Sequence, residues 1–368
     1  MDIDRKYVSF GEQAIFRLRD LYSRFGYQRY KMSRFEEYDL YVRNKDFLVS
    51  DEVITFTDRS GRLLAMKPDV TLSIIKNAPD APGALQKVYY NENVYRTDGG
   101  HAFREIMQSG LESIGDLTQY DIAEVVLLAA KSLALISERF VLDISHMGLI
   151  AALLEQSGLS PAGRSEALIC LRQKNSHELR ALCRRENTDP EKLVLLSECC
   201  GSADTVLPKI KPFMDSEALR AAFGQLDALC TMLARCGFRD SVRLDFSVGN
   251  DLKYYSGVVF KGYIEGIPAS VLSGGQYDAL LRKMGRKSSA IGFALYTDLL
   301  EQLPKSPADY DVDAVLLHDC SDDGLMAAAL TLAEAGSVLV CTAIPQHKRW
   351  RRLLKYENGE VLTLENNG

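Results

Sequence analysis

Two long strand-like runs, joined by a short turn that contains Gly99 and Gly100, constrain the fold of this chain more than any other feature. The runs cover 86–96 and 104–113. Apolar and β-branched runs of this length, separated by a short glycine-containing turn, predict an antiparallel pair. We expect the pair to form a platform within a larger sheet. The glycine-containing tip can act as a loop that closes over a ligand.

The second run carries polar residues on one face. Because side chains alternate along a strand, Gln108, Gly110 and Glu112 share a face. A buried glutamine and glutamate are costly without a partner, and the glycine between them is expected to leave room for a ligand. We therefore predict that this face lines a pocket.

A tyrosine-rich segment, DFSVGNDLKYYSGVVF at 245–260, places Tyr254 and Tyr255 between two predicted strands. Because neighbouring side chains on a strand point to opposite faces, only one of the two rings is expected to face a given cavity. Further along, SGGQYDALL predicts a Gly-Gly turn that delivers Tyr277 to the start of a helix. Aromatic hydroxyls beside flexible backbone suit a small polar ligand with a flat ring. The alternative is a tyrosine-rich sheet with a hairpin and no ligand.

Asp69 lies in the segment KPDVT, directly after a predicted hairpin at 55–66. Pro68 ends the second strand of that hairpin. Asp69 then either caps the predicted helix 70–76 or points at a ligand, and capping is the commoner role of an aspartate at such a position.

The predicted elements divide the chain into a long core and a short tail. Strands and helices are mixed up to about residue 147, helices dominate 148–236, and strands resume at 242. This order predicts a helical insertion at 148–236 within a core that spans 1–306. A proline-containing linker then leads to a small α/β unit at 307–368. The fold class is therefore α+β, an antiparallel sheet flanked by helices.

Composition argues against several classes of protein. The N-terminus lacks an apolar signal sequence, and no apolar run reaches the length of a membrane helix, so we expect a cytoplasmic chain without a membrane partner. The 8 cysteines show neither a CxxC pair nor a zinc pattern, so we expect no metal. The glycine motifs of nucleotide cofactor sites are absent, and no cofactor is expected.

A net charge of −6 does not favour a nucleic-acid partner, because phosphate binding relies on a positive surface. The densest basic run lies at 348–355 and is interrupted by Trp350. We interpret it as the solvated face of a helix rather than as a binding patch.

Several of these segments resemble motifs of the histidyl-tRNA synthetases, which are class II aminoacyl-tRNA synthetases. LAMKPDVT resembles their LRPEGT segment, whose carboxylate and threonine hold the ammonium group of the amino acid; the matching residues are Asp69 and Thr71. The stretch NVYRTDGG…FREIMQSGLES resembles motif 2. Its arginine positions are Arg96 and Arg104, and Gln108 and Glu112 match the residues that bind the amino group and the imidazole.

The tyrosine segments extend this resemblance. NDLKYYSGVVF resembles the histidine-specific motif RGLDYYTGTVFE and includes Tyr254 and Tyr255, whereas GGQYDAL resembles GGRYDGL and supplies Tyr277. The resemblance covers about 12–303 and implies a class II synthetase fold with a histidine pocket.

The chain departs from the synthetases where they handle ATP. Asn250 replaces an arginine that stabilises the carboxylate during activation, and Leu299 replaces one that holds the ATP phosphates, with Asp298 beside it. The motif 2 loop is shortened, and Ala102 lies near the place of a further arginine. Adenylate formation depends on preorganised cations, so these losses imply that activation is abolished. The tail is also too short for an anticodon-binding domain.

A histidine pocket without the ATP machinery resembles the regulatory subunits of ATP phosphoribosyltransferase, which are synthetase paralogues of histidine biosynthesis. The resemblance implies that this chain has no catalytic residues. It implies association with the short-form catalytic subunit, activation of that subunit, and feedback inhibition with L-histidine as the effector. The implied assembly is a hetero-octamer built on synthetase-like homodimers.

Three questions stay open at the level of sequence. The inhibitory histidine binds either in the inherited pocket, which we favour, or at the interface with the catalytic subunit. The chain could instead be a truncated but active histidyl-tRNA synthetase. It could also be a stand-alone module that binds histidine or RNA.

Overall fold

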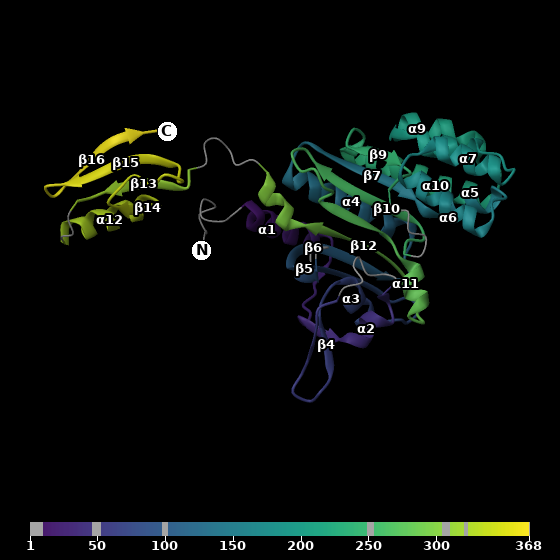
Figure 1. Cartoon of the computed structure of the whole chain (residues 1–368), viewed down its shortest axis with the longest axis horizontal. Coiled ribbons are helices and arrows are strands. Elements are labelled where there is room, and N and C mark those ends of the chain that lie inside the picture. Colours follow the sequence, from purple (N-terminus) through teal and green to yellow (C-terminus); the bar gives the residue numbers. More distant parts are fainter. Residues whose placement is uncertain are drawn as a thin grey trace. The chain divides into compact units, whose positions relative to one another are not determined.

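The computed structural model describes residues 10–45, 53–97, 102–248, 254–303, 310–319 and 323–367. The chain divides into two compact units, Met1–Leu303 and Pro304–Gly368, and each is described by itself (Figure 1). The predicted linker, 304–307, lies outside the described residues.

A nine-stranded sheet forms the centre of the first unit, in the order β1-β5-β6-β12-β11-β10-β7-β9-β8. Along the described residues its pairings are antiparallel, apart from β1 with β5 and β7 with β9, which are parallel. The strands are β1 (Gln28–Arg29), β5 (Leu85–Thr97), β6 (Phe103–Gly115), β7 (Phe140–His146), β8 (Cys200–Ser202), β9 (Val242–Asp245), β10 (Val258–Ile264), β11 (Leu272–Gln276) and β12 (Ser289–Tyr296). The predicted α+β class is confirmed.

The long antiparallel pair predicted from the sequence is β5 with β6. Their register places Leu85 opposite Gly115 at one end and Arg96 opposite Arg104 near the other. The strands are a little longer than predicted, and the tip of their turn at 98–101 lies outside the described residues. The polar face of β6 thereby comes to lie in the middle of the sheet, between β5 and β12.

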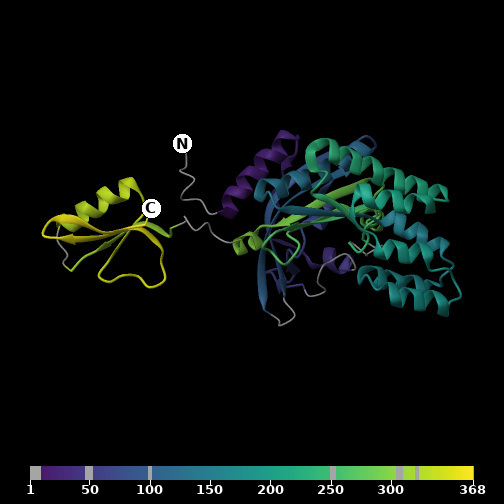
Figure 2. The same cartoon turned by 90° about the horizontal axis from the view of Figure 1, so that it is seen from above.

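Helices cover both faces of the large sheet, and each face has its own apolar core (Figures 1 and 2). Helices α1 (Phe10–Arg24) and α4 (Gln119–Ile136) pack on one face. The short helices α2 (Tyr38–Val42), α3 (Thr71–Asn77) and α11 (Asp278–Lys283) pack on the other. The strand period of two explains the division, because on β5 Tyr89 joins the first core while Val88 and Tyr90 join the second.

A separate small sheet has the order β2-β4-β3 and consists of β2 (Phe35–Glu37), β3 (Thr55–Thr57) and β4 (Leu63–Met66). The predicted hairpin at 55–66 is confirmed, with Gly61 in the left-handed region at φ 82°. Strand β2 was not predicted from the sequence. Strand β1 is short, because only Gln28 and Arg29 pair with β5.

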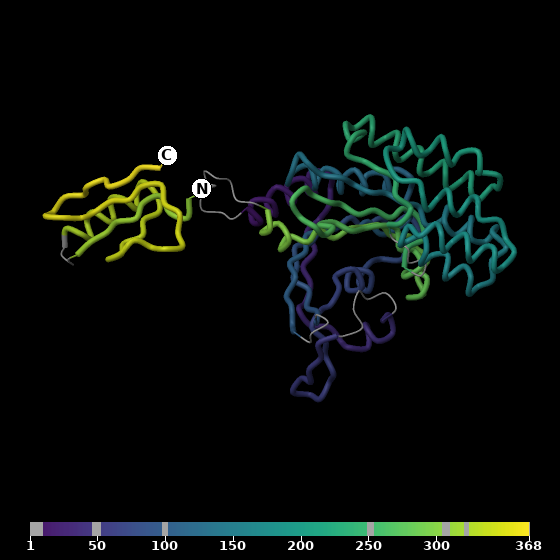
Figure 3. Tube along the Cα trace, turned by 45° about the horizontal axis from the view of Figure 1, so that its top comes forward, coloured from purple at the N-terminus to yellow at the C-terminus, as the bar shows by residue number. Residues whose placement is uncertain are grey.

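Helices α5 to α10 form the insertion between β7 and β9 and gather at one end of the sheet (Figure 3). Their bounds are α5 (Met147–Gln156), α6 (Pro161–Arg172), α7 (Ser176–Arg185), α8 (Glu191–Glu198), α9 (Ala203–Ile210) and α10 (Glu217–Leu233). Helix α9 was not predicted from the sequence, because Pro208 lies inside it and proline usually ends a helix. The block is also not purely helical, since it contains β8.

The second unit is a four-stranded sheet in the order β14-β13-β15-β16 with one helix. Its elements are β13 (Val312–Leu317), α12 (Asp323–Ala335), β14 (Val338–Cys341), β15 (Trp350–Glu357) and β16 (Glu360–Asn366). Asn358 and Gly359 form the turn between β15 and β16, both with positive φ, as a type I′ turn requires.

The prediction that the basic run at 348–355 forms a helix face is wrong. Most of it belongs to β15, which lies between β13 and β16. Leu354 and Tyr356 lie on either side of Lys355 and are buried in the core that includes α12 residues. The spacing of two between these apolar side chains is the strand signal that the interpretation from charge alone missed.

We predict that replacing Gly110 with alanine destabilises the first unit. A Cβ there would lie 2.3 Å from the Phe293 carbonyl oxygen and 2.4 Å from the Tyr90 hydroxyl. Overpacking against backbone in the sheet should lower the free energy of unfolding by about 1–3 kcal/mol. The matched control is Gly224→Ala in α10, where no described atom lies within 4 Å. That change should stabilise the protein by about 0.5–1 kcal/mol, because glycine is a poor helix former.

Urea unfolding of the whole chain, followed by far-UV circular dichroism, measures both changes. Tryptophan fluorescence is unsuitable, because the single tryptophan belongs to the second unit. A Gly110→Ala variant as stable as the wild type would contradict the packing described for β5, β6 and β12.

Candidate functional site

One cavity of about 240 Å³ opens on the face of the large sheet that also carries α3 and α11. It brings together all seven residues that the resemblance assigns to a histidine pocket, and Arg96 as well. Its lining comprises Asp69, Thr71, Tyr90, Arg96, Gln108, Glu112, Tyr254, Tyr255, Ser273, Gly274, Gly275, Tyr277, Gly292, Phe293, Ala294 and Tyr296.

The Glu112 carboxyl lies at the centre of the cavity's hydrogen bonds and is only 2% exposed. It accepts a hydrogen bond from the Thr71 hydroxyl at 2.8 Å and another from the Tyr277 hydroxyl. Gly292 on β12 lies opposite it, and a Cβ there would be 1.6 Å from Glu112 Oε2. Residues of β6, β12, α3 and the start of α11 therefore fix this one carboxyl.

The pKa of Glu112 is raised to about 8, mainly by burial and to a smaller extent by the nearby Asp69 carboxylate. The hydrogen bonds from Tyr277 and Thr71 act in the opposite direction, because they stabilise the ionised form. Glu112 is therefore mostly protonated at neutral pH when no ligand occupies the cavity. A cationic group beside it would favour the carboxylate.

Asp69 caps α3, one of the two roles that the sequence left open, and it also reaches the cavity. Its Oδ1 accepts a hydrogen bond from the backbone N–H of Leu72 at 2.9 Å, in the first turn of α3. The same side chain lines the cavity. Burial raises the pKa of Asp69, while the hydrogen bond from Leu72 and the charge of Arg96 partly offset that rise.

Arg96 is the one cationic side chain among the described residues that line the cavity. Its Nε donates to the Pro68 carbonyl oxygen at 3.1 Å, and its guanidinium bonds the Tyr296 hydroxyl. The described lining therefore holds two carboxyl groups and one guanidinium. A ligand that brings a positive charge completes this set better than a neutral one.

The expectation that only one ring of Tyr254 and Tyr255 can face a given cavity is wrong, because both rings line this one. Their centroids are 4.6 Å apart at an interplanar angle of 68°, and Tyr254 lies 6.1 Å from the Tyr277 ring. Strand β10 begins only at Val258, so the alternation of side chains along a strand does not apply to them.

The predicted Gly-Gly turn is also wrong. Gly274 and Gly275 lie inside β11, paired with β10 and β12 in the interior of the sheet. A Cβ on Gly275 would lie 2.7 Å from the Tyr255 ring. Glycine is present here for close approach rather than for a turn.

Gly110 does not leave room for a ligand, contrary to expectation. The space above it is filled by Tyr90, the residue opposite it on β5. Sequence reasoning missed Tyr90 and Tyr296 as lining residues. Their positions follow from the register, in which Tyr296 lies opposite Gln108, and a register is not visible in one strand's sequence.

Arg104 does not reach this cavity. It lines a second one together with Glu105, Ile106, Ser270, Tyr296, Asp298 and Leu299, and Tyr296 borders both. Leu299 thus faces the space beside Arg104, in the 3₁₀ helix Thr297–Gln302. Asn250 lies outside the described residues, and Ala102 is at the edge of the described part.

No group of three or more histidine, cysteine, aspartate or glutamate side chains among the described residues could hold a metal ion. Within the described ranges, none of the helices combines the length and apolar character needed to cross a membrane.

Comparison with known proteins shows which family the chain resembles. The family model described as histidyl-tRNA synthetase matches residues 2–300. An ATP phosphoribosyltransferase regulatory subunit from Acetivibrio thermocellus is 29% identical over 76% of this chain and 69% of its own length. A histidine–tRNA ligase from Archaeoglobus fulgidus is 30% identical over 77% of this chain and 69% of its own length.

Among solved structures, the ATP phosphoribosyl transferase (HisG:HisZ) complex from Thermotoga maritima contains a similar chain. The TM-score is 0.64 at 20% identity, over 78% of this chain and 97% of that one, which shows a shared fold. The chain belongs to the histidyl-tRNA synthetase family, and it is similar to that family's ATP phosphoribosyltransferase regulatory subunits over 76% of its length.

Proposed function

We propose that this chain is the non-catalytic regulatory subunit of ATP phosphoribosyltransferase. It activates the short-form catalytic subunit and mediates feedback inhibition by L-histidine in the first step of histidine biosynthesis. The names of the relatives support this assignment. The observation that carries it is a contrast between two adjoining cavities: one keeps the complete carboxyl and tyrosine set, and the other holds Leu299 where the synthetases have an arginine.

Histidine is the ligand that we propose for the first cavity. Its ammonium group would face Asp69, Thr71 and Gln108. Its imidazole would bond Glu112 beside Tyr255, with Tyr254 and Tyr277 closing the wall. The charge balance supports this ligand, because two buried carboxyl groups favour a partner with a cationic ammonium and a protonatable ring. Arg96 would be the described cation available to the ligand's carboxylate.

Loss of synthetase activity is part of the proposal. Transfer of the adenylyl group concentrates negative charge at phosphorus, and preorganised cations stabilise that charge. The second cavity offers the guanidinium of Arg104, but it also contains the carboxyl group of Asp298 and the apolar Leu299. Removing one such cationic or hydrogen-bonding donor typically costs about 10²–10³ in rate, so several losses should abolish activation.

Feedback control requires more than binding. Histidine shifts activity only if it binds one state of the complex more tightly than another, since equal affinity shifts nothing. We propose that the chain forms synthetase-like homodimers within a cytoplasmic hetero-octamer, with no nucleic-acid partner. The HisG:HisZ complex of Thermotoga maritima supports a partnership between two kinds of subunit.

The truncated synthetase remains the second candidate, because a histidine–tRNA ligase is among the relatives. Leu299 disfavours it, since an apolar side chain cannot hold a phosphate.

One experiment separates the candidates. We expect the purified chain to form a stable complex with a short-form catalytic subunit and to increase its formation of phosphoribosyl-ATP, with histidine suppressing that increase. The same preparation should catalyse no histidine-dependent exchange between ATP and pyrophosphate, with an authentic histidyl-tRNA synthetase as positive control. Exchange at synthetase-like rates would refute the proposal, and so would failure to bind or activate the catalytic subunit.

The affinity for histidine should be greatest between about pH 6.5 and pH 8. In this range the free imidazole is mostly neutral, with a pKa of about 6.5, and Glu112, with a pKa of about 8, holds one proton. The complex also holds one proton, shared by carboxylate and imidazole, so binding neither takes up nor releases one. Below this range the free imidazole is also protonated, so binding must release a proton. Above it Glu112 is ionised, so binding must take one up. Affinity should fall on both sides, as calorimetric titration from pH 5 to pH 9 can measure.

Glu112→Gln is the control for this profile. Affinity at pH 7 should fall about tenfold or more, because a charge-assisted hydrogen bond is lost. The fall in affinity above pH 8 that Glu112 causes (the alkaline limb of the profile) should disappear. Any fall due to the ligand's own amino group should remain. The tyrosines near Glu112 should not titrate in this range, because burial raises the pKa of Tyr254, Tyr255 and Tyr277. An unchanged profile in Glu112→Gln would contradict the assigned role.

A further inference from the structure

Two short helices deliver the hydroxyl groups that bond Glu112. Thr71 is the first residue of α3, and Tyr277 directly precedes α11. Helix α3 has 7 residues and α11 has 6. Helices this short have little stability of their own, so external contacts must set their positions.

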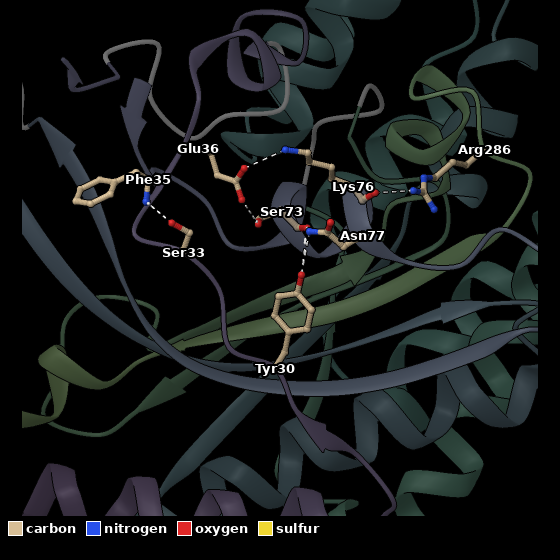
Figure 4. A network of polar contacts seen from close by, with 8 residues as sticks. All are labelled: Tyr30, Ser33, Phe35, Glu36, Ser73, Lys76, Asn77 and Arg286. Carbon is tan, nitrogen blue, oxygen red and sulfur yellow. Dashed lines mark hydrogen bonds and ion pairs between the residues drawn. The ribbon is translucent and has the colours of Figure 1, made fainter. Parts of the chain in front are cut away.

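The other ends of these helices are tied together by Arg286, which follows α11 (Figure 4). Its Nη2 donates to the Lys76 carbonyl oxygen at 3.0 Å, and its Nη1 donates to the Ala78 carbonyl oxygen at 2.5 Å. Both carbonyls lie at the C-terminal end of α3, where the last carbonyls lack helical partners and a cation is favourable. The Arg286 backbone N–H bonds the Leu281 carbonyl oxygen of α11 at 2.9 Å.

A second contact runs in the reverse direction. Asp80, just beyond α3, accepts hydrogen bonds at Oδ1 from the Ser288 backbone N–H at 3.2 Å and from its hydroxyl at 2.9 Å. The segment after α3 therefore holds the segment after α11, while Arg286 holds α3. We call Arg286 with Asp80 the latch.

Helix α3 is also fixed to β2 and to Tyr30. Glu36 on β2 accepts from the Ser73 hydroxyl at 2.8 Å and pairs with the Lys76 ammonium at 3.1 Å, as Figure 4 shows. On the same helix, the Asn77 amide donates to the Tyr30 hydroxyl at 3.1 Å. These contacts fix α3 to β2 and Tyr30, whereas the latch fixes the C-terminal end of α3 to the C-terminal end of α11.

We propose that Arg286 is a positioning residue of the histidine pocket. By holding the C-terminal ends of α3 and α11 together, it keeps Thr71 and Tyr277 in register at the two oxygens of Glu112. Arg286 does not line the cavity, so it acts through these two donors rather than on the ligand. The identity of the ligand rests on the proposed function, whereas the latch rests on the contacts above.

Calorimetric titration of the full chain with L-histidine tests the proposal. Arg286→Ala should weaken binding about tenfold. The matched control is Arg282→Ala, which removes the same charge from an exposed position on α11 and should change affinity less than twofold. The affinity of Arg286→Lys for histidine should lie between those of Arg286→Ala and Arg282→Ala, because a single ammonium cannot reproduce the two parallel donors of a guanidinium.

Two further measurements distinguish positioning from a general loss of stability. In the Thr71→Val, Tyr277→Phe double variant, adding Arg286→Ala should lower the affinity for histidine by less than a further twofold. The two hydroxyl groups through which Arg286 acts are already absent there. In addition, weaker donation to Glu112 should move the alkaline limb of the affinity profile to higher pH in Arg286→Ala. General destabilisation would lower affinity without moving that limb.

If Arg286→Ala does not fold, Asp80→Asn loosens the latch from its other side and should show the same two signatures. Equal affinities for Arg286→Ala, Arg282→Ala and the wild type would overturn the proposal, as would a full tenfold loss in the background without both hydroxyls. A wild-type chain that binds no histidine would instead refute the assigned ligand, which separates the two failures.

Discussion

The organisation of the pocket depends on the buried carboxyl of Glu112. A carboxyl that is 2% exposed is tolerated only where hydrogen bonds compensate for the water it has lost. Here Thr71 and Tyr277 supply them, and Gly292 makes room for them by lacking a side chain. Each of these residues comes from a different element, so the folded positions of α3, α11 and β12 meet at one functional group.

The same carboxyl connects structure to chemistry. Its raised pKa leaves it protonated in the free pocket, and an imidazole that accepts the proton turns two neutral groups into an ion pair. Such a pair in a buried site gains from the low local dielectric only when both partners are also hydrogen-bonded. The pocket therefore suits a ligand that both donates hydrogen bonds and carries a proton near neutral pH.

The adjoining cavity differs in chemistry from the pocket. Tyr296 lines both spaces, but the second one combines Arg104 with Asp298 and Leu299. Cations that act on phosphates contribute to a reaction rather than to packing, so their replacement need not disturb the sheet. The lining of the pocket and the residues around Arg104 can therefore change independently of each other.

Many of the structural elements and most of the pocket residues could be predicted from the sequence alone. Strand period and turn chemistry predicted β5 with β6, the tail unit and most helices, and the motif resemblance gathered seven pocket residues that do line one cavity. The roles of Gly110, Gly275, Tyr90 and the paired tyrosines were decided only by the tertiary structure. Strand register sets which side chain covers a glycine. Because β10 begins only at Val258, Tyr254 and Tyr255 lie outside the strand and do not alternate. Local patterns fix elements because they depend on neighbours in the chain, whereas a cavity depends on which distant strands become neighbours.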